Sequence, residues 1–199
     1  MAYLLDANVF LEAKNDHYGM DFFPAFWRWL TLSHADGQIL SIVEVREELK
    51  DDEIRPWVTA QTPDFFRSGG ASTVEAHQRI DEWLDKAPYV DSAMLGFTGC
   101  ADVHLVAYAL AHGHTVVTQE KMAETAHKVK IPNACRALKV RCINTIEMLR
   151  ELQARFVLGP VHEPYEGANL AKISKDEPPR PAAADVQEAL LRSVSTGTD

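Results

Sequence analysis

Two acidic residues follow predicted strands. Asp6 comes directly after the apolar run Tyr3–Leu5, and Glu120 comes shortly after the β-branched run 115–118. Ligands of a parallel α/β sheet gather beyond the carboxyl ends of its strands. An acid beside a buried apolar strand also conflicts with its surroundings, and such local conflicts are expected at functional sites. Asp6 and Glu120 are therefore the first candidates for a shared site.

Two further acids lie on predicted helices. Asp102 falls in the first turn of a helix that begins near Ala101, where the helix dipole favours a negative charge. Glu48 lies about two turns into a helix opened by Ser41, on the face that we expect to point inward. Acids from four separate segments could thus converge on one rim: Asp6, Glu48, Asp102 and Glu120.

A cluster of carboxylates provides the oxygen ligands that hard divalent cations prefer. Without a cation, clustered acids repel one another and some of them take up protons. With Mg²⁺ or Mn²⁺ bound, such a site can activate water and neutralise a phosphate under attack, which is nuclease chemistry. The spacing does not distinguish one ion from two. Structural alternatives stay open for each acid: Asp6 as a turn cap, Asp102 as a helix N-terminal acid, Glu120 as a partner of Lys121, and Glu44 or Glu47 in the place of Glu48.

The elements that must position these acids alternate between strands and helices. Such alternation predicts an α/β fold, with a parallel sheet covered on both faces. Capping-box patterns at Ser41/Glu44 and Asn144/Glu147 predict two helix starts, and Gly113 predicts a helix end. The expected strands are 3–5, 37–40, 115–118 and 140–143, the expected helices are one starting near Pro24, 41–49, 73–84, 101–112 and 144–156, and 51–70 is expected to be a loop.

Composition predicts one domain and a tail. Of 199 residues, 46% are hydrophobic, which is enough for one core over residues 1–158. Residues 159–199 are Pro-rich and predict a partly disordered tail with a short helix at 185–194, which could dock on a partner or on a second copy. No apolar run approaches the roughly 20 residues that span a bilayer, and no secretory signal is recognisable. Three cysteines without paired spacing predict free thiols in a reducing cytoplasm.

The net charge of −9 argues at first against a nucleic-acid partner. Its distribution is uneven, because residues 121–141 contain six Lys or Arg and a single acid, Glu124. A basic stripe on an acidic protein can still bind a phosphate backbone, although a solvated helix face would have the same composition. The candidate RNA-binding residues are Lys121, Lys128, Lys130 and Arg136.

The motifs, in their order, resemble the PIN-domain family of nucleases. The similarity covers about residues 2–156. It is greatest to the PIN-like group catalogued as a domain of unknown function, with its aromatic stretch after the first Asp and a segment like Ile131–Cys135. The matching motifs are Tyr3-Leu4-Leu5-Asp6-Ala7-Asn8, Ser41 to Leu49, Ala101-Asp102 to Ala109, and Val116-Val117-Thr118-Gln119-Glu120-Lys121.

This resemblance implies a three-layer α/β/α sandwich and a Mg²⁺- or Mn²⁺-dependent endoribonuclease, often the toxin of a toxin–antitoxin pair. RNA would be the substrate and an antitoxin protein the partner. Glu120 departs from the more usual Asp, which places its carboxylate one methylene farther out. Carried over by position, Asp6, Glu48, Asp102 and Glu120 would hold the metal and serve catalysis, while Asn8 and Thr118 would support the site.

Two other functions are consistent with the same residues. A PIN-like module could bind RNA or a protein without cutting, which the acidic surface and the unusual Glu120 favour. A phosphatase with Asp6 as its nucleophile is a third reading, but that chemistry wants a second acid two residues later, where Asn8 stands.

Overall fold

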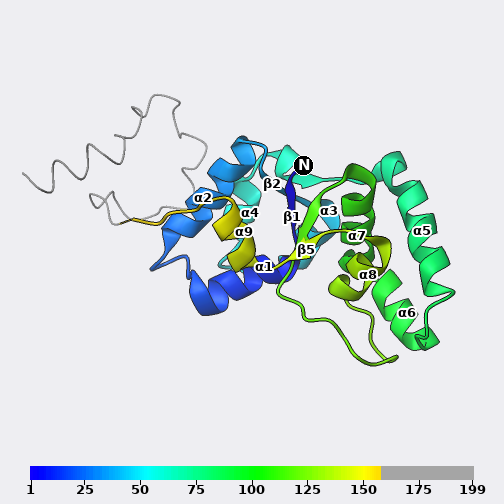
Figure 1. The fold of residues 1–199 in the computed structure, drawn as a ribbon. Helices are drawn as coiled ribbons and strands as arrows, with labels where there is room; N and C mark the ends of the chain where they lie inside the picture. Colours follow the sequence, from blue (N-terminus) through cyan, green and yellow to red (C-terminus); the bar gives the residue numbers. More distant parts are fainter. Residues whose placement is uncertain (158–199) are drawn as a thin grey trace, which may run out of the picture. The chain divides into compact units, whose positions relative to one another are not determined.

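The computed structural model describes residues 1–157, which form a three-layer α/β/α sandwich around a five-stranded sheet (Figure 1). All strand pairs are parallel, and the strand order is β3-β2-β1-β4-β5. The predicted α/β/α class is therefore confirmed. The predicted tail, its helix and the boundary at residue 158 lie outside the described residues. The strands are β1 (Tyr3–Leu5), β2 (Ile39–Ile42), β3 (Phe66–Arg67), β4 (Thr115–Val117) and β5 (Cys142–Ile143).

Helices cover both faces of the sheet. Figure 1 shows α2 and α9 on one side and α7 and α8 on the other, with α5 and α6 packed outside α7. The helices are α1 (Ala7–Glu12), α2 (Pro24–Ala35), α3 (Val43–Glu48), α4 (Arg55–Ala60), α5 (Val74–Leu84), α6 (Asp91–Thr98), α7 (Ala101–His112), α8 (Ile131–Leu138) and α9 (Thr145–Glu151), joined by a π-helical turn (Ala13–His17) and 3₁₀ turns (Pro63–Phe65, Gly70–Thr73).

The direction of the chain across the sheet reverses between β1 and β4. From β1 the chain crosses to β2 and β3 on one side, whereas from β4 it crosses to β5 on the other. Leu4 in β1 pairs with Leu40 in β2 and with Val116 in β4, so β1 lies at the centre of the sheet. The carboxyl ends of β1 and β4 therefore form the topological switch point, where open α/β sheets place their ligands.

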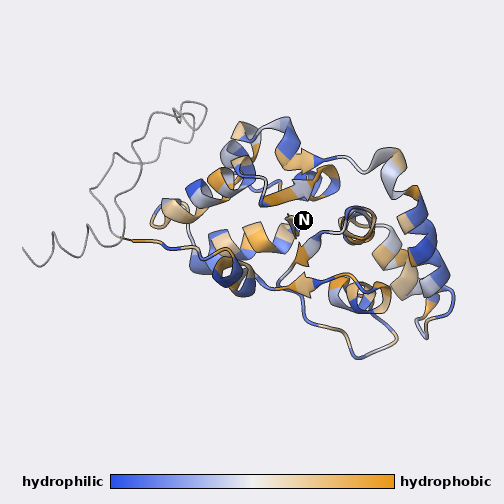
Figure 2. Cartoon of the chain, turned by 45° about the horizontal axis from the view of Figure 1, so that its top comes forward, coloured by the Kyte–Doolittle hydropathy of each residue, from blue (hydrophilic) through white to orange (hydrophobic). Residues whose placement is uncertain are grey.

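Aromatic side chains fill the core beside β2. Figure 2 shows hydrophobic colouring on the central strands. The rings of Trp27 and Trp57 lie 5.2 Å apart, Trp57 and Phe65 5.5 Å apart, and Phe10 and Trp57 5.7 Å apart, all centroid to centroid. All four side chains are fully buried. Aromatic pairs at this spacing add to the stabilisation that comes from their buried area.

Several predicted boundaries are wrong. Ser41 does not cap a helix, because it lies within β2 and its hydroxyl donates to the Leu5 carbonyl at 2.6 Å. The segment 51–70 is not a loop, since it contains α4, a 3₁₀ turn and β3, and it buries Trp57 and Phe65. Helix α6 was not predicted, and the last helix ends at Glu151 rather than near residue 156.

Two helix boundaries are confirmed with their capping chemistry. Helix α7 ends at Gly113, whose φ of 67° lies in the left-handed region that favours glycine. Helix α9 starts with a capping box in which Asn144 Oδ1 accepts from the Glu147 backbone at 2.9 Å, and Glu147 Oε2 accepts from the Asn144 backbone at 2.8 Å.

No single helix within residues 1–157 is long and apolar enough to cross a membrane. Helices α6 and α7 pass that test only as a pair, by length and composition, with a bend of 69° between them.

Replacing Phe10 by Ala should lower the free energy of unfolding by about 3–5 kcal/mol, because it leaves a cavity among closely packed rings. Phe22→Ala is the matched control, since Phe22 is 67% exposed and its loss should change stability by no more than about 0.5 kcal/mol. Urea unfolding followed by circular dichroism measures both values. Equal losses for the two variants would contradict the assignment of the core.

Candidate functional site

Asp6 follows β1 at the switch point and is 4% exposed. Its backbone N–H continues the sheet by donating to the Val117 carbonyl at 3.0 Å. Its side chain caps α1, because Oδ1 accepts from the Ala7 backbone at 2.7 Å. Oδ2 accepts from the Thr118 hydroxyl, also at 2.7 Å. Asp6 therefore caps a helix, as the structural alternative predicts, and also lies at the centre of the candidate site.

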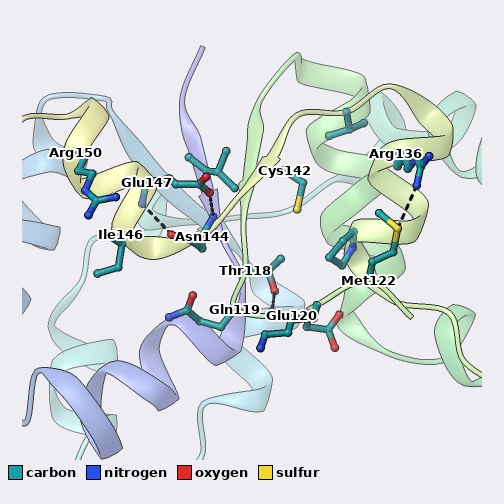
Figure 3. A pocket seen from close by; sticks show the side chains of 14 residues that line it. Thr118, Gln119, Glu120, Met122, Arg136, Cys142, Asn144, Ile146, Glu147 and Arg150 are labelled. Atoms are coloured by element: carbon teal, nitrogen blue, oxygen red, sulfur yellow. Dashed lines mark hydrogen bonds between the residues drawn. The ribbon is translucent and has the colours of Figure 1, made fainter. Parts of the chain in front are cut away.

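Asn8 and Thr118 tie the ends of β1 and β4 together. The Asn8 amide donates to Thr118 Oγ1 at 3.1 Å, and Asn8 Oδ1 accepts from the Gln119 backbone at 3.0 Å. The Glu120 backbone also donates to Thr118 Oγ1, at 3.1 Å (Figure 3). The Thr118 hydroxyl therefore accepts two hydrogen bonds and donates one to Asp6. These contacts give both residues the positions expected of supporting side chains.

Glu48 and Asp102 lie near Asp6. The negative charges of Asp102 and Glu48 both raise the pKa of Asp6, and the charge of Asp102 raises the pKa of Glu48. Asp102 is in the first turn of α7 as predicted. Glu48 ends α3 and is exposed as a whole residue rather than pointing inward, although its carboxyl group is partly desolvated. The Ala101 backbone at the start of α7 lies near Glu48 and lowers the pKa of its carboxyl group, in part offsetting desolvation. Three of the four predicted acids are therefore within electrostatic reach of one another.

Burial dominates the protonation of these acids. Desolvation, together with the nearby charge of Asp102, raises the pKa of Asp6 to about 7, although hydrogen bonds from Thr118 and Ala7 favour its charged form. Desolvation also raises the pKa values of Glu48 and Asp102. The Cys100 thiol beside Asp102, and then the positive charge of Lys130, partly offset the effect on Asp102. The site thus concentrates negative charge that the surrounding protein compensates only in part.

Glu120 is held apart from this group. Its carboxylate pairs with the Lys130 ammonium group through Oε1 and accepts from the Ile131 backbone through Oε2 at 3.0 Å. Ile131 is the first residue of α8, so Glu120 fixes the start of that helix. The expected partner Lys121 is not the residue it pairs with. Glu120 as a metal ligand stays a prediction, and it would require the pair with Lys130 to open.

The arrangement fits a hard cation in chemistry and in charge. Carboxylate oxygens are the preferred ligands of Mg²⁺. Desolvation raises the pKa values of Asp6, Glu48 and Asp102, and the charge of Asp102 raises those of the other two further, so a cation would stabilise their charged forms. Within residues 1–157, however, no three His, Cys, Asp or Glu side chains are grouped closely enough to hold a metal ion. Mg²⁺ commonly binds to one or two carboxylates and retains several waters, so a cluster of three is not a requirement.

The structure adds Cys100 and His104 to the residues near the acids. Both line a pocket of about 480 Å³ together with Glu44, Glu47 and Glu48. Of these three glutamates, Glu48 is the one whose charge reaches Asp6, which favours it over the two alternatives. Burial and the charge of Asp102 raise the pKa of the Cys100 thiol to about 11, so this thiol is protonated at neutral pH. The sequence offered one sign that Cys100 lies near the acids: it directly precedes the helix whose first turn contains Asp102.

The cations of residues 121–141 lie in different surroundings. Lys121 and Arg136 line a larger pocket of about 700 Å³ at the carboxyl ends of β4 and β5, and Lys128 is exposed without lining it. Lys130 pairs with Glu120, and Arg141 pairs with Glu151. Sequence analysis missed Arg150 on α9, which lines the same pocket from another segment of the chain.

The fold and these contacts define an α/β/α protein with a carboxylate site at its switch point. A family model described as Domain of unknown function (DUF4411) matches residues 3–156, and the chain belongs to this family. Searches of curated proteins and of solved structures found no match to the chain.

Asp6→Asn should change how stability depends on pH. Since the pKa of Asp6 is raised to about 7 in the fold, wild type loses stability as pH rises from about 4 to 7, by about 4 kcal/mol for this group alone. The variant lacks this loss, so its free energy of unfolding relative to wild type should increase between pH 4.5 and pH 8 without divalent cations. Urea titrations at several pH values, with exposed Asp81→Asn as the control, measure the trend. A difference that is constant with pH would disprove the burial of an ionisable charge at Asp6.

Proposed function

We propose that this protein is a PIN-like, metal-dependent endoribonuclease. The observation that carries the proposal is the proximity of Asp6, Glu48 and Asp102, with each pKa raised by desolvation and with the charge of Asp102 acting on the other two. Carboxylates brought together from three segments are poorly compensated unless a cation joins them. The order of the motifs supports the same class, since it resembles that of PIN nucleases.

Each residue has a distinct part in the proposed reaction. Asp6, Glu48 and Asp102 would hold Mg²⁺ or Mn²⁺, which supplies charge neutralisation for the phosphate and activates water. Thr118 and Asn8 keep the Asp6 carboxylate in one orientation through the bonds described above. Lys121 and Arg136 would hold the RNA backbone beside the acids. The proposed toxin role and antitoxin partner follow from the resemblance, and co-expression of the neighbouring gene with this chain would test them.

A non-cutting PIN-like module that binds RNA or protein is the second candidate. The pairing of Glu120 with Lys130 favours it, because it engages one of the four predicted ligands. The absence of a three-ligand cluster among residues 1–157 points the same way. Metal affinity and RNA cleavage distinguish the two candidates.

Asp102→Asn should lower RNA cleavage by at least about 100-fold, because it removes a proposed ligand while keeping the side-chain shape. Wild type should cleave fluorescent single-stranded RNA with Mn²⁺ or Mg²⁺, and not with EDTA. Mn²⁺ should raise the melting temperature of wild type, but much less that of the variant.

Glu47→Gln is the matched control, since Glu47 lies one residue before Glu48 on α3 and its charge does not reach Asp6. It should retain both activity and Mn²⁺ binding. Mn²⁺ binding that is lost in Asp102→Asn, without cleavage of any RNA tested, would favour the binding module. Equal cleavage by wild type and Asp102→Asn would exclude the proposed mechanism.

Lys130→Met should tighten Mn²⁺ binding by about 10-fold. Lys130 supplies positive charge to Glu120 and Asp102 in the structure. Without it, the negative charges of these two acids would be less compensated, and a bound cation would be attracted more strongly. Calorimetric titration measures the affinity, and exposed Lys128→Met is the control for a general change of charge. Weaker binding in Lys130→Met would instead show that Lys130 orients the acids for the metal.

A further inference from the structure

A pocket at the carboxyl ends of β4 and β5, which we call the α8–α9 pocket, adjoins the candidate site. It has a volume of about 700 Å³ (Figure 3). Its wall includes Thr118, whose hydroxyl donates to Asp6. One segment of chain thus forms part of the acid site and part of the pocket. The volume is within the range of about 300–1,000 Å³ that is usual for ligand pockets.

The balance of charge in this pocket is positive, unlike that of the whole chain. Lys121, Arg136 and Arg150 line it, and Figure 3 shows the two arginines on opposite sides. The acids that line it are already engaged. Glu120 pairs with Lys130, and the carboxylate of Glu147 accepts from the Asn144 backbone. An anionic ligand would therefore meet cations at both sides of the pocket.

Apolar side chains lie between these cations. Met122 is 41% exposed and Ile146 is 39% exposed, and both line the pocket. Arg136 approaches the Met122 sulfur at 3.5 Å, so a cation and an apolar surface lie next to each other. Gln119 and Asn144 add amide groups to the lining. Apolar contacts with a few polar groups are what a flat, hydrogen-bonding ring requires.

We propose that the α8–α9 pocket binds one unpaired nucleotide of a single-stranded RNA, next to the phosphate that is cut. The base packs on Met122 and Ile146, while Arg136, Arg150 and Lys121 hold the adjoining phosphates. A base can enter the pocket only when it is splayed out of a helix, so the substrate class is single-stranded RNA rather than duplex. The position of the pocket next to the cut phosphate rests on the proposed function. The binding of the strand to the pocket does not depend on cleavage.

Binding is measured with a fluorescent single-stranded RNA of mixed sequence in EDTA, by anisotropy, at several salt concentrations. The double variant Arg136→Ala/Arg150→Ala should bind at least about 10-fold more weakly than wild type. Its plot of log affinity against log salt should be shallower by about 1.4, since each lost phosphate contact of a single strand accounts for about 0.7. Ile146→Ser should weaken binding and leave the salt slope unchanged, because it removes an apolar contact only.

Arg79→Ala, an exposed arginine on α5 outside the pocket lining, is the matched control and should bind like wild type. The same RNA as a duplex should bind at least about 10-fold more weakly than the single strand. Equal binding of the duplex, or unchanged binding by the double variant, would overturn the proposal. Tighter binding of a poly-glutamate peptide than of RNA would also overturn it and assign the pocket to a protein partner.

Cleavage by the same variants separates the two proposals. If wild type cuts RNA and the double variant cuts equally well at low RNA concentration, the pocket inference fails while the nuclease stands. If neither wild type nor any variant cuts RNA but the double variant loses RNA binding, the proposed nuclease function is excluded. The pocket then stands as a binding site for single-stranded RNA.

Discussion

The rest of this site depends on one constraint: the Asp6 carboxylate is buried at the switch point, where the order of the strands reverses. Asp6 must follow β1 between two strands, and burial there without hydrogen bonds would be costly. The first amide of α1 and the Thr118 hydroxyl provide those bonds. Thr118 must therefore lie directly after β4, and Asn8 joins the ends of β1 and β4 through its bonds to Thr118 and Gln119. These bonds do not fully offset desolvation, so the pKa of Asp6 is about 7. At neutral pH, a modest amount of added positive charge therefore decides whether Asp6 is ionised.

Lys130 supplies positive charge next to Asp6's neighbour Asp102. It pairs with Glu120 and acts on Asp102, although it comes from the segment just before α8 rather than from the switch point. Because Glu120 also accepts from the first amide of α8, the chain between β4 and α8 is held to the helix by a carboxylate that the sequence suggested as a metal ligand. The same contacts thus stabilise the helix start and limit how many acids face a cation. The structural role of Glu120 would therefore compete with its proposed role as a metal ligand.

Local patterns predicted the parts of the structure that depend on local chemistry. The Asn144 capping box, the glycine end of α7 and the apolar strand before Asp6 all follow from neighbouring residues. The errors involve partners distant in sequence. Ser41 fits a capping pattern, yet its hydroxyl bonds to Leu5 across the sheet. The prolines and acids of residues 51–70 suggested a loop, but burial of Trp57 and Phe65 against Phe10 and Trp27 determines its structure. In the same way, sequence spacing placed Glu120 at the site without revealing that Lys130 pairs with it.

For an acidic protein to bind RNA, as proposed for this chain, its acids and its cations must lie in separate places. The acids at the switch point would repel RNA phosphates, and the net charge of −9 adds to that repulsion at long range. Salt screens exposed charges beyond about 8 Å at physiological ionic strength, so the nearest groups have the largest effect. In the α8–α9 pocket those groups are Lys121, Arg136 and Arg150, beside acids already engaged in hydrogen bonds. If the chain binds RNA as proposed, cations next to the acids, rather than a basic surface overall, would hold the strand beside a site that repels it.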